Sequence, residues 1–146
     1  MNTLKEKIRR NEGFKSYVYE DTRGFATIGY GFKLTSLSKD ELALNGGKTE
    51  PMSREVAERI LDIKLTNLYN EVFTTFSWLH DKPKNVQEVV IEMCYQMGVG
   101  AVKKFATTLH HIRCGEYKSA YESGLKSLWA KQTPNRAKRV LSGLFK

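Results

Sequence analysis

Residues 11 to 31, NEGFKSYVYEDTRGFATIGYG, carry two carboxylic acids and a threonine whose types suit hydrolysis. Eight residues separate Glu12 from Asp21, and five more separate Asp21 from Thr27. If Glu12 ends a helix against apolar neighbours, partial burial would raise its pKa and keep it protonated, whereas Asp21 would sit at a wetter turn. A proton donor paired with a carboxylate is what cleavage of a glycosidic bond requires. The alternative is a helix-end charge and a turn former.

The flanking patterns predict the elements that would hold these side chains. Leu4 and Ile8 lie one helical turn apart and predict a short helix over residues 3–10. The stretch SYVYED has strand composition, DTRG suits a type I turn, and FATIGYG continues with β-favouring residues. We therefore expect a small hairpin-like sheet. Ser38 and Glu41 have capping-box spacing and predict a short helix after it.

The rest of the chain has helical periodicity. A long helix is expected from Ser53, because apolar residues recur there at steps of three and four. Thr133 and Pro134 suit the N-cap and first position of the last helix. The expected helices after the long one are 86–97, 103–113, 117–123, 125–131 and 135–144. The predicted fold class is α+β, mainly α: an N-terminal α/β lobe (1–52), a connecting helix (53–76) and a helical lobe (77–146).

Composition limits the classes of function. The 146 residues are 40% hydrophobic and 27% charged, as in ordinary globular domains, and no apolar run is long enough to span a membrane. The first residues are too charged for a secretory signal, so we expect Cys94 and Cys114 to be reduced. The net charge of +8 favours a polyanionic partner, namely nucleic acid, an anionic membrane or an acidic wall polymer.

Three other patterns are weaker. The run GGKT at 46–49 lacks the earlier glycine of a phosphate-binding loop, so we expect a turn. His110 and Cys114 share a helical face, but His111 points elsewhere and no third ligand has matching spacing, so we expect a polar patch and no metal site. Apolar residues of the basic C-terminal segment recur at helical spacing and favour core over a nucleic-acid surface.

The order and spacing of these residues resemble the phage-type lysozymes, glycoside hydrolase family 24. The stretch NEGF…YEDTRGFATIGYG is similar to that family's active-site hairpin. YQMG (95–98) and WAKQTPNRAKRVL (129–141) are similar, in the same order, to later stretches of its T-even phage members. The likeness covers nearly the whole chain, with a shorter loop around residues 35–52 and a shortened C-terminal end.

The resemblance implies a role for each catalytic candidate. Glu12 matches the general acid, Asp21 the carboxylate on the base side, and Thr27 the hydroxyl that helps to hold the attacking water. Inversion at the anomeric carbon would need the two carboxyl groups roughly 6.5–9.5 Å apart. Arg136 matches an arginine that pairs with the catalytic glutamate, and such a pair would oppose the rise in the pKa of Glu12 expected from burial.

The resemblance also implies substrate-binding positions and two departures from the family. Lys33 stands where the family has an apolar residue, and Phe32 replaces a histidine that forms a stabilising ion pair. Thr108 and Ser123 stand where related enzymes have other polar residues, so the side chains remain polar but differ in length. The expected substrate-binding residues are Lys33, Tyr95, Gln96, Phe105, Thr108 and Ser123, for several of which helical core is the alternative.

The implied function is an endolysin. It would be a muramidase that hydrolyses the β-1,4 bond between N-acetylmuramic acid and N-acetylglucosamine in peptidoglycan, without cofactor or metal. As a monomer it would wait in the host cytoplasm until a holin releases it to the wall in the periplasm, with membrane contact secondary and no nucleic acid bound. A lytic transglycosylase, or a cationic binding module that lacks catalysis, remains the alternative.

Overall fold

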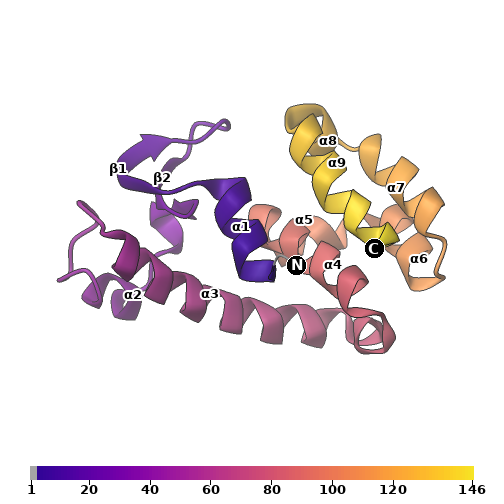
Figure 1. Ribbon diagram of the computed structural model, residues 1–146, viewed down its shortest axis with the longest axis horizontal. Coiled ribbons are helices and arrows are strands. Elements are labelled where there is room, and N and C mark those ends of the chain that lie inside the picture. Colours follow the sequence, from indigo (N-terminus) through magenta and orange to yellow (C-terminus); the bar gives the residue numbers. More distant parts are fainter. Residues whose placement is uncertain (1–2) are drawn as a thin grey trace. The chain divides into compact units, whose positions relative to one another are not determined.

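The computed structural model describes residues 3–146 and divides the chain into two compact units, Met1–Thr66 and Asn67–Lys146 (Figure 1). The predicted class, α+β and mainly helical, is confirmed. The boundary between the units falls inside the long helix α3 (Arg54–Thr75), which therefore contributes to both. Each unit has its own elements and its own packing.

The sheet of the first unit is the hairpin that the sequence predicts. Its strands are β1 (Lys15–Glu20), β2 (Ala26–Gly29) and β3 (Phe32–Lys33), in antiparallel order β1-β2-β3. The turn DTRG joins the first two strands, and the Gly24 N–H donates to the carbonyl of Asp21 over 2.9 Å. Thr27 pairs with Tyr19 on one side and with Lys33 on the other, so it occupies the centre of the sheet.

The first two helices, α1 and α2, begin at capping boxes. In α1 (Leu4–Glu12) the Thr3 hydroxyl accepts from the backbone of Glu6, and the Glu6 carboxylate accepts from the backbone of Thr3. In α2 (Lys39–Ala43) Ser38 and Glu41 exchange the same two bonds, as predicted. These reciprocal bonds satisfy backbone N–H groups that a helix start would leave without partners. The run 46–49 lies in a turn and bend, as expected.

The Glu58 carboxylate on α3 ties α1 to the sheet. Nζ of Lys5 lies 2.8 Å from Oε2 of Glu58, and Nε of Arg9 lies 2.7 Å from Oε1. The Tyr30 hydroxyl donates to Oε1 over 3.1 Å. Burial alone would raise the pKa of Glu58, but the hydrogen bonds from Lys5, Tyr30 and Arg9 outweigh it and lower that pKa. The carboxylate thus stays charged and holds three donors from two elements.

The second unit consists of short helices after α3. Its helices are α4 (Lys84–Met97), α5 (Val99–Lys103), α6 (Ala106–Arg113), α7 (Tyr117–Leu125), α8 (Leu128–Gln132) and α9 (Pro134–Ser142). Figure 1 shows α6 beside α7, and α8 running into α9. Buried apolar side chains from these helices form the core, among them Val90, Ile91, Ile112, Ala137 and Leu141.

Two helices begin three residues later than the sequence predicts. The expected helix 103–113 starts only at Ala106, because Phe105 leaves the helical region with ψ at 53°. The expected helix 125–131 starts at Leu128, because the Ser127 hydroxyl accepts from the Ala130 N–H and caps a new helix there. Pro134 begins α9 as predicted.

Thr133 occupies the N-cap position of α9 without capping it through its side chain. Its hydroxyl instead donates to the carbonyl of Trp129 over 3.0 Å and so serves the end of α8. Thr133 lies between the end of α8 and the start of α9, and its single hydroxyl could bond to either helix. In the structure it bonds to α8.

Cys94 and Cys114 are both free thiols. Cys94 is buried on α4, whereas Cys114 is exposed after α6. Burial, with a smaller contribution from the charge of Glu71, raises the pKa of Cys94 to about 12.

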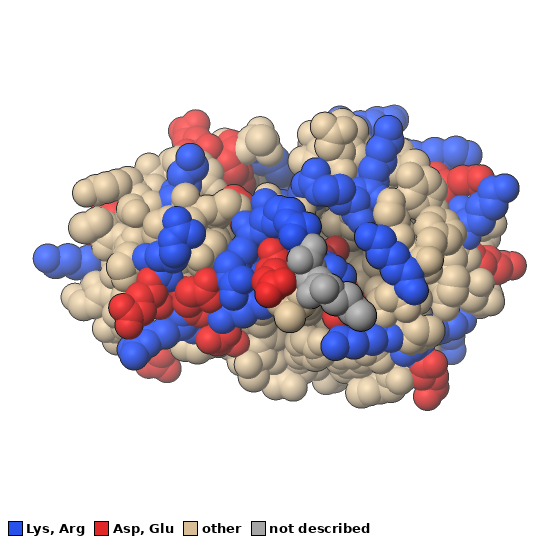
Figure 2. All heavy atoms as spheres, in the orientation of Figure 1, with Lys and Arg blue, Asp and Glu red and all other residues tan. Residues whose placement is uncertain are grey.

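Lys and Arg side chains are spread over the face shown in Figure 2 and are more prominent there than acidic side chains. This distribution agrees with the net charge of +8. No helix within residues 3–146 has the length and apolar character needed to cross a membrane.

We expect Glu58→Gln to lower the free energy of unfolding by about 1–2 kcal/mol at neutral pH, because three donors lose a charged acceptor that is only partly exposed. The folded-state pKa of Glu58 lies below its ordinary value of 4.5. The contribution is therefore complete above about pH 4.5 and disappears as the pH falls through the folded-state pKa.

Urea unfolding of the parent and of Glu58→Gln, between neutral pH and pH 3, measures the difference in their free energies of unfolding. This difference should become smaller as the pH falls. Glu55→Gln is the control, because it removes the same charge from an exposed position of the same helix. Equal stability of the parent and Glu58→Gln at neutral pH would show that the carboxylate does not secure α1.

Candidate active site

Glu12 is the last residue of α1 and is half-buried. The helix stops there because Gly13 adopts a positive φ of 69°, and its N–H donates to the carbonyl of Arg9 over 2.8 Å. Gly31, which follows β2, lies against the Glu12 side chain. A Cβ placed on Gly31 would overlap Oε1 of Glu12 and come within 2.7 Å of its Cδ. The absence of a side chain at Gly31 therefore makes room for this carboxyl group.

Asp21 lies at the start of the β1–β2 turn with one carboxylate oxygen fixed by the backbone. Its Oδ1 accepts from the N–H groups of Arg23 and Phe25, each over 2.9 Å. Within residues 3–146 both of these side-chain bonds use Oδ1, so Oδ2 is left to accept from another molecule. The turn thus orients a half-buried carboxylate.

Thr27 is buried in β2, with only 2% of its surface exposed. Its hydroxyl donates to the carbonyl of Phe25 over 2.7 Å. A hydroxyl has one proton and two lone pairs, so this bond leaves Thr27 as an acceptor for any further hydrogen bond.

Short hydrogen bonds link two of these residues, Asp21 and Thr27, and Glu12 lies against a residue further along the same chain segment. The Thr27 hydroxyl bonds to the carbonyl of Phe25, whose N–H bonds to Asp21. Four residues after Thr27, the same chain segment reaches Gly31 and the side chain of Glu12. All three predicted catalytic residues therefore belong to α1 and the hairpin that follows it, and their joint role in catalysis stays a prediction.

Phe25 at the same turn carries two cations on its ring. The guanidinium of Arg23 lies 5.4 Å from the ring centroid and Nζ of Lys33 lies 4.2 Å from it. Phe25 itself is exposed. Lys33, predicted to bind substrate, pairs with Thr27 across the sheet, and its ammonium is held over Phe25 by a cation–π contact.

Two predicted substrate residues of the second unit surround Trp129. The indole N–H of Trp129 donates to Oε1 of Gln96 over 2.8 Å. The ring of Phe105 meets the indole edge-on, with centroids 6.2 Å apart. The pair holds α4 and the start of α6 against α8. Contact of Gln96 and Phe105 with a sugar remains a prediction.

The remaining predicted residues also belong to the second unit. Thr108 on α6 is buried, and its hydroxyl lies 2.9 Å from that of Ser123 on α7, so the two side chains join these helices. Tyr95 and Arg136 are half-buried on α4 and α9. The ion pair of Arg136 with Glu12 and the substrate contacts of this group stay predictions.

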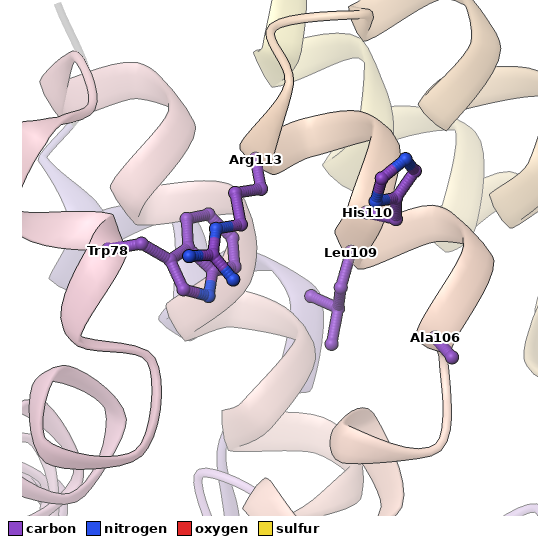
Figure 3. A pocket seen from close by; sticks show the side chains of 5 residues that line it. All are labelled: Trp78, Ala106, Leu109, His110 and Arg113. Atoms are coloured by element: carbon purple, nitrogen blue, oxygen red, sulfur yellow. The ribbon is translucent and has the colours of Figure 1, made fainter.

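A hollow of about 210 Å³ lies elsewhere in the second unit, between Trp78 and α6 (Figure 3). Ala106, Leu109, His110 and Arg113 line it from the helix. None of the predicted site residues lines this hollow.

Sequence reasoning missed two residues that position Glu12. Gly31 leaves space for the carboxyl group, and Glu58 binds Lys5 and Arg9 on the helix that Glu12 ends. The run IGYG contained a signal for Gly31, because two glycines in a short strand often mark a close approach of another group. Glu58 is one charge among many on a long helix and gave no such signal.

Comparisons with known proteins identify the family of the chain. Residues 9–146 match the family described as phage lysozyme. Over 94% of its length the chain is 33% identical to the pre-baseplate central spike protein Gp5 of Enterobacteria phage T4, of which it spans 27%. Over 97% of its length it is 28% identical to probable T4-type lysozymes 1 and 2 of Dictyostelium discoideum, of which it spans 93%. Since the family match covers nearly every residue, including the hairpin with Glu12, Asp21 and Thr27, the chain belongs to the phage lysozyme family.

Proposed function

We propose that this glycosidase is a muramidase that hydrolyses the β-1,4 bond between N-acetylmuramic acid and N-acetylglucosamine in peptidoglycan. The observation that carries the proposal is the β1–β2 turn, where Asp21 and Thr27 are linked through Phe25 and both keep a hydrogen-bond acceptor in reserve. Family membership supports the same conclusion independently.

In this proposal Glu12 is the general acid. Cleavage of a glycosidic bond needs a proton on the departing oxygen, and a carboxylic acid fixed beside the sugar supplies it. Glu12 is suited to this role because α1 and Gly31 restrict its side chain. Arg136 is proposed to pair with this carboxyl group.

Asp21 and Thr27 place the attacking water. The water donates one hydrogen bond to the Thr27 hydroxyl, which already gives its own proton to Phe25. Oδ2 of Asp21 accepts the other proton as the water attacks the anomeric carbon. Direct attack by water inverts the configuration at that carbon.

We also propose contacts between the protein and peptidoglycan away from the bond that is cleaved. Stem peptides of peptidoglycan carry carboxylates, and the net charge of +8 favours encounter with such a polyanion. Lys33, the strand partner of Thr27, is proposed to contact the substrate, together with Tyr95, Gln96, Phe105, Thr108 and Ser123 of the second unit.

For the biological role we propose host lysis and phage release. The enzyme would act as a monomer, stay in the host cytoplasm until a holin opens the inner membrane, and then reach the wall from the periplasm. Membrane contact would be secondary. Expression in a host with and without a holin gene tests this part, because lysis should depend on the holin.

Two alternatives make different products. A lytic transglycosylase cuts the same bond but leaves an anhydro sugar and usually has no second catalytic carboxylate, so Asp21 favours hydrolysis. A cationic module without catalysis would bind the wall or a membrane and release no fragments.

Glu12→Gln should reduce the rate of clearing of chloroform-permeabilised Gram-negative cells by at least ~100-fold, because glutamine has no proton to transfer. The parent should release muropeptides with reducing N-acetylmuramic ends. Turbidity gives the rate, chromatography of the fragments gives the product, and circular dichroism confirms that the variant is folded.

Glu55→Gln is the control and should clear cells at the rate of the parent, because its carboxylate is exposed on α3 and outside the hairpin. Anhydro ends would assign the enzyme to the transglycosylases. Equal lysis by folded Glu12→Gln would mean that the basic surface, and not the proposed site, breaks the cells.

Asp21→Asn separates the catalytic carboxylate from its structural role. The amide oxygen can still accept from Arg23 and Phe25, so the turn should persist, while the charged oxygen that takes the proton is lost. We expect a fall of at least ~100-fold in kcat with an unchanged circular dichroism spectrum. Asp40→Asn, at an exposed position of α2, is the control and should keep the parental kcat. Retention of activity by Asp21→Asn would exclude Asp21 as the base.

Gly31→Ala should lower activity by displacing the Glu12 carboxyl group, since the new Cβ would overlap Oε1. Gly31 also has a φ of 75°, so the variant should lose about 1 kcal/mol or more of stability through backbone strain. Gly47→Ala, with a φ of 78° but open space around the new Cβ and a position outside the hairpin, is the matched control. If both variants lose equal activity, strain alone is responsible and the contact with Glu12 is irrelevant.

A further inference from the structure

Three potential metal ligands converge where α6 ends and α7 begins. Nε2 of His110 and Sγ of Cys114 are 3.7 Å apart, and one ligand atom from each of His110, Cys114 and Glu116 falls within 4.8 Å of the others. All three side chains are exposed. Helical spacing places His110 and Cys114 on one face but predicts no third ligand.

The helix ending explains how Glu116 joins them. The Cys114 N–H donates to the carbonyl of His110, and the Glu116 N–H donates to the carbonyl of His111 over 2.8 Å. Between them Gly115 adopts a φ of 76°, which reverses the chain direction. Glu116 therefore lies back over the last turn of α6, a position that helical periodicity cannot predict.

The spacing of the two helical ligands suits a tetrahedral ion. Zn²⁺ binds imidazole nitrogen at about 2.0 Å and thiolate sulfur at about 2.3 Å, and tetrahedral angles then place the two atoms about 3.5 Å apart. The observed 3.7 Å requires almost no adjustment. The Glu116 side chain is exposed, so small rotations can bring one oxygen to bonding distance.

A neighbouring histidine orients the third ligand. Nδ1 of His111 lies 2.9 Å from Oε1 of Glu116, which leaves Oε2 to coordinate. Ligating carboxylates are commonly held by such outer hydrogen bonds. Nζ of Lys82 donates to the carbonyl of Arg113, so two cationic residues lie near the end of α6, and the ligands must outweigh their repulsion of a divalent ion. A thiolate and a carboxylate together balance the two charges of the ion.

We propose that His110, Cys114 and Glu116 form a surface site for Zn²⁺ or a similar borderline-soft divalent ion, with water or an external anion as the fourth ligand. Nitrogen, sulfur and oxygen donors in this combination favour such ions over Mg²⁺ or Ca²⁺, which prefer oxygen alone. The bound ion would connect the end of α6 to the start of α7. The site does not depend on the proposed muramidase activity.

Cobalt titration of the reduced full-length protein at neutral pH tests the site. Bound Co²⁺ should give the visible bands of tetrahedral coordination and a sulfur-to-cobalt band in the near ultraviolet, and Zn²⁺ should abolish both by displacement. In Cys114→Ser the sulfur band should disappear and affinity should fall by at least ~100-fold, although the buried Cys94 is still present. No bands in the parent, or a sulfur band that persists in Cys114→Ser, would overturn the proposal.

Two acidic positions on the same segment give a matched pair. Glu116→Gln should weaken Co²⁺ binding by at least ~10-fold, whereas Glu122→Gln, exposed on α7, should leave the affinity within about twofold. His110→Gln should weaken binding more than His111→Gln, because only His110 is a ligand. The reverse order of the two histidine variants, or equal effects of the two glutamate variants, would show that this ligand set is wrong.

Zn²⁺ should also raise the melting temperature of the parent and not that of Cys114→Ser, because an ion bound only by the folded state stabilises it. A shift of equal size in both proteins would show that Zn²⁺ binds elsewhere.

Discussion

The carboxylate of Glu58, with Lys5, Arg9 and Tyr30 around it, is the interaction on which the first unit depends. α1 has only two buried side chains, Leu4 and Ile8, and its charged residues need a defined partner. Glu58 supplies that partner and at the same time holds Tyr30, the residue before Gly31. One acceptor therefore fixes both the helix that ends at Glu12 and the backbone that leaves space for its carboxyl group. The low pKa of Glu58 is the electrostatic consequence of this crowding of donors.

The fold could be predicted from sequence wherever its cause is local. The capping box of Ser38 and Glu41, the turn at Asp21 and the start of α9 at Pro134 all depend on residues within four positions of each other. Prediction failed where a local pattern had two solutions. Apolar spacing continues through Phe105, yet the backbone leaves the helix there, and the Thr133 hydroxyl serves the helix before it instead of the one after it.

The candidate site shows the same division. Asp21 and Thr27 belong to one hairpin, so their proximity follows from the predicted turn, and α1 leads directly into that hairpin from Glu12. The long-range contacts were beyond sequence reasoning: Gly31 against Glu12, Glu58 against α1, and the hydroxyl pair of Thr108 and Ser123. Glu116 was missed for a different reason. Its approach to His110 depends on a left-handed glycine, which breaks the periodicity that was used to search for ligands.

The burial of Cys94 has a consequence for the chemical durability of the enzyme. Because burial raises the pKa of Cys94 to about 12, its thiol stays protonated at pH 7, and the surrounding core excludes reagents. Oxidants that attack thiolates will therefore react at the exposed Cys114, on the surface of the second unit, before they reach α4. Sulfenic acid formed at that position leaves the packing of the core intact. Thiol oxidation is therefore expected at the exposed Cys114, where it does not disturb the buried core around Cys94.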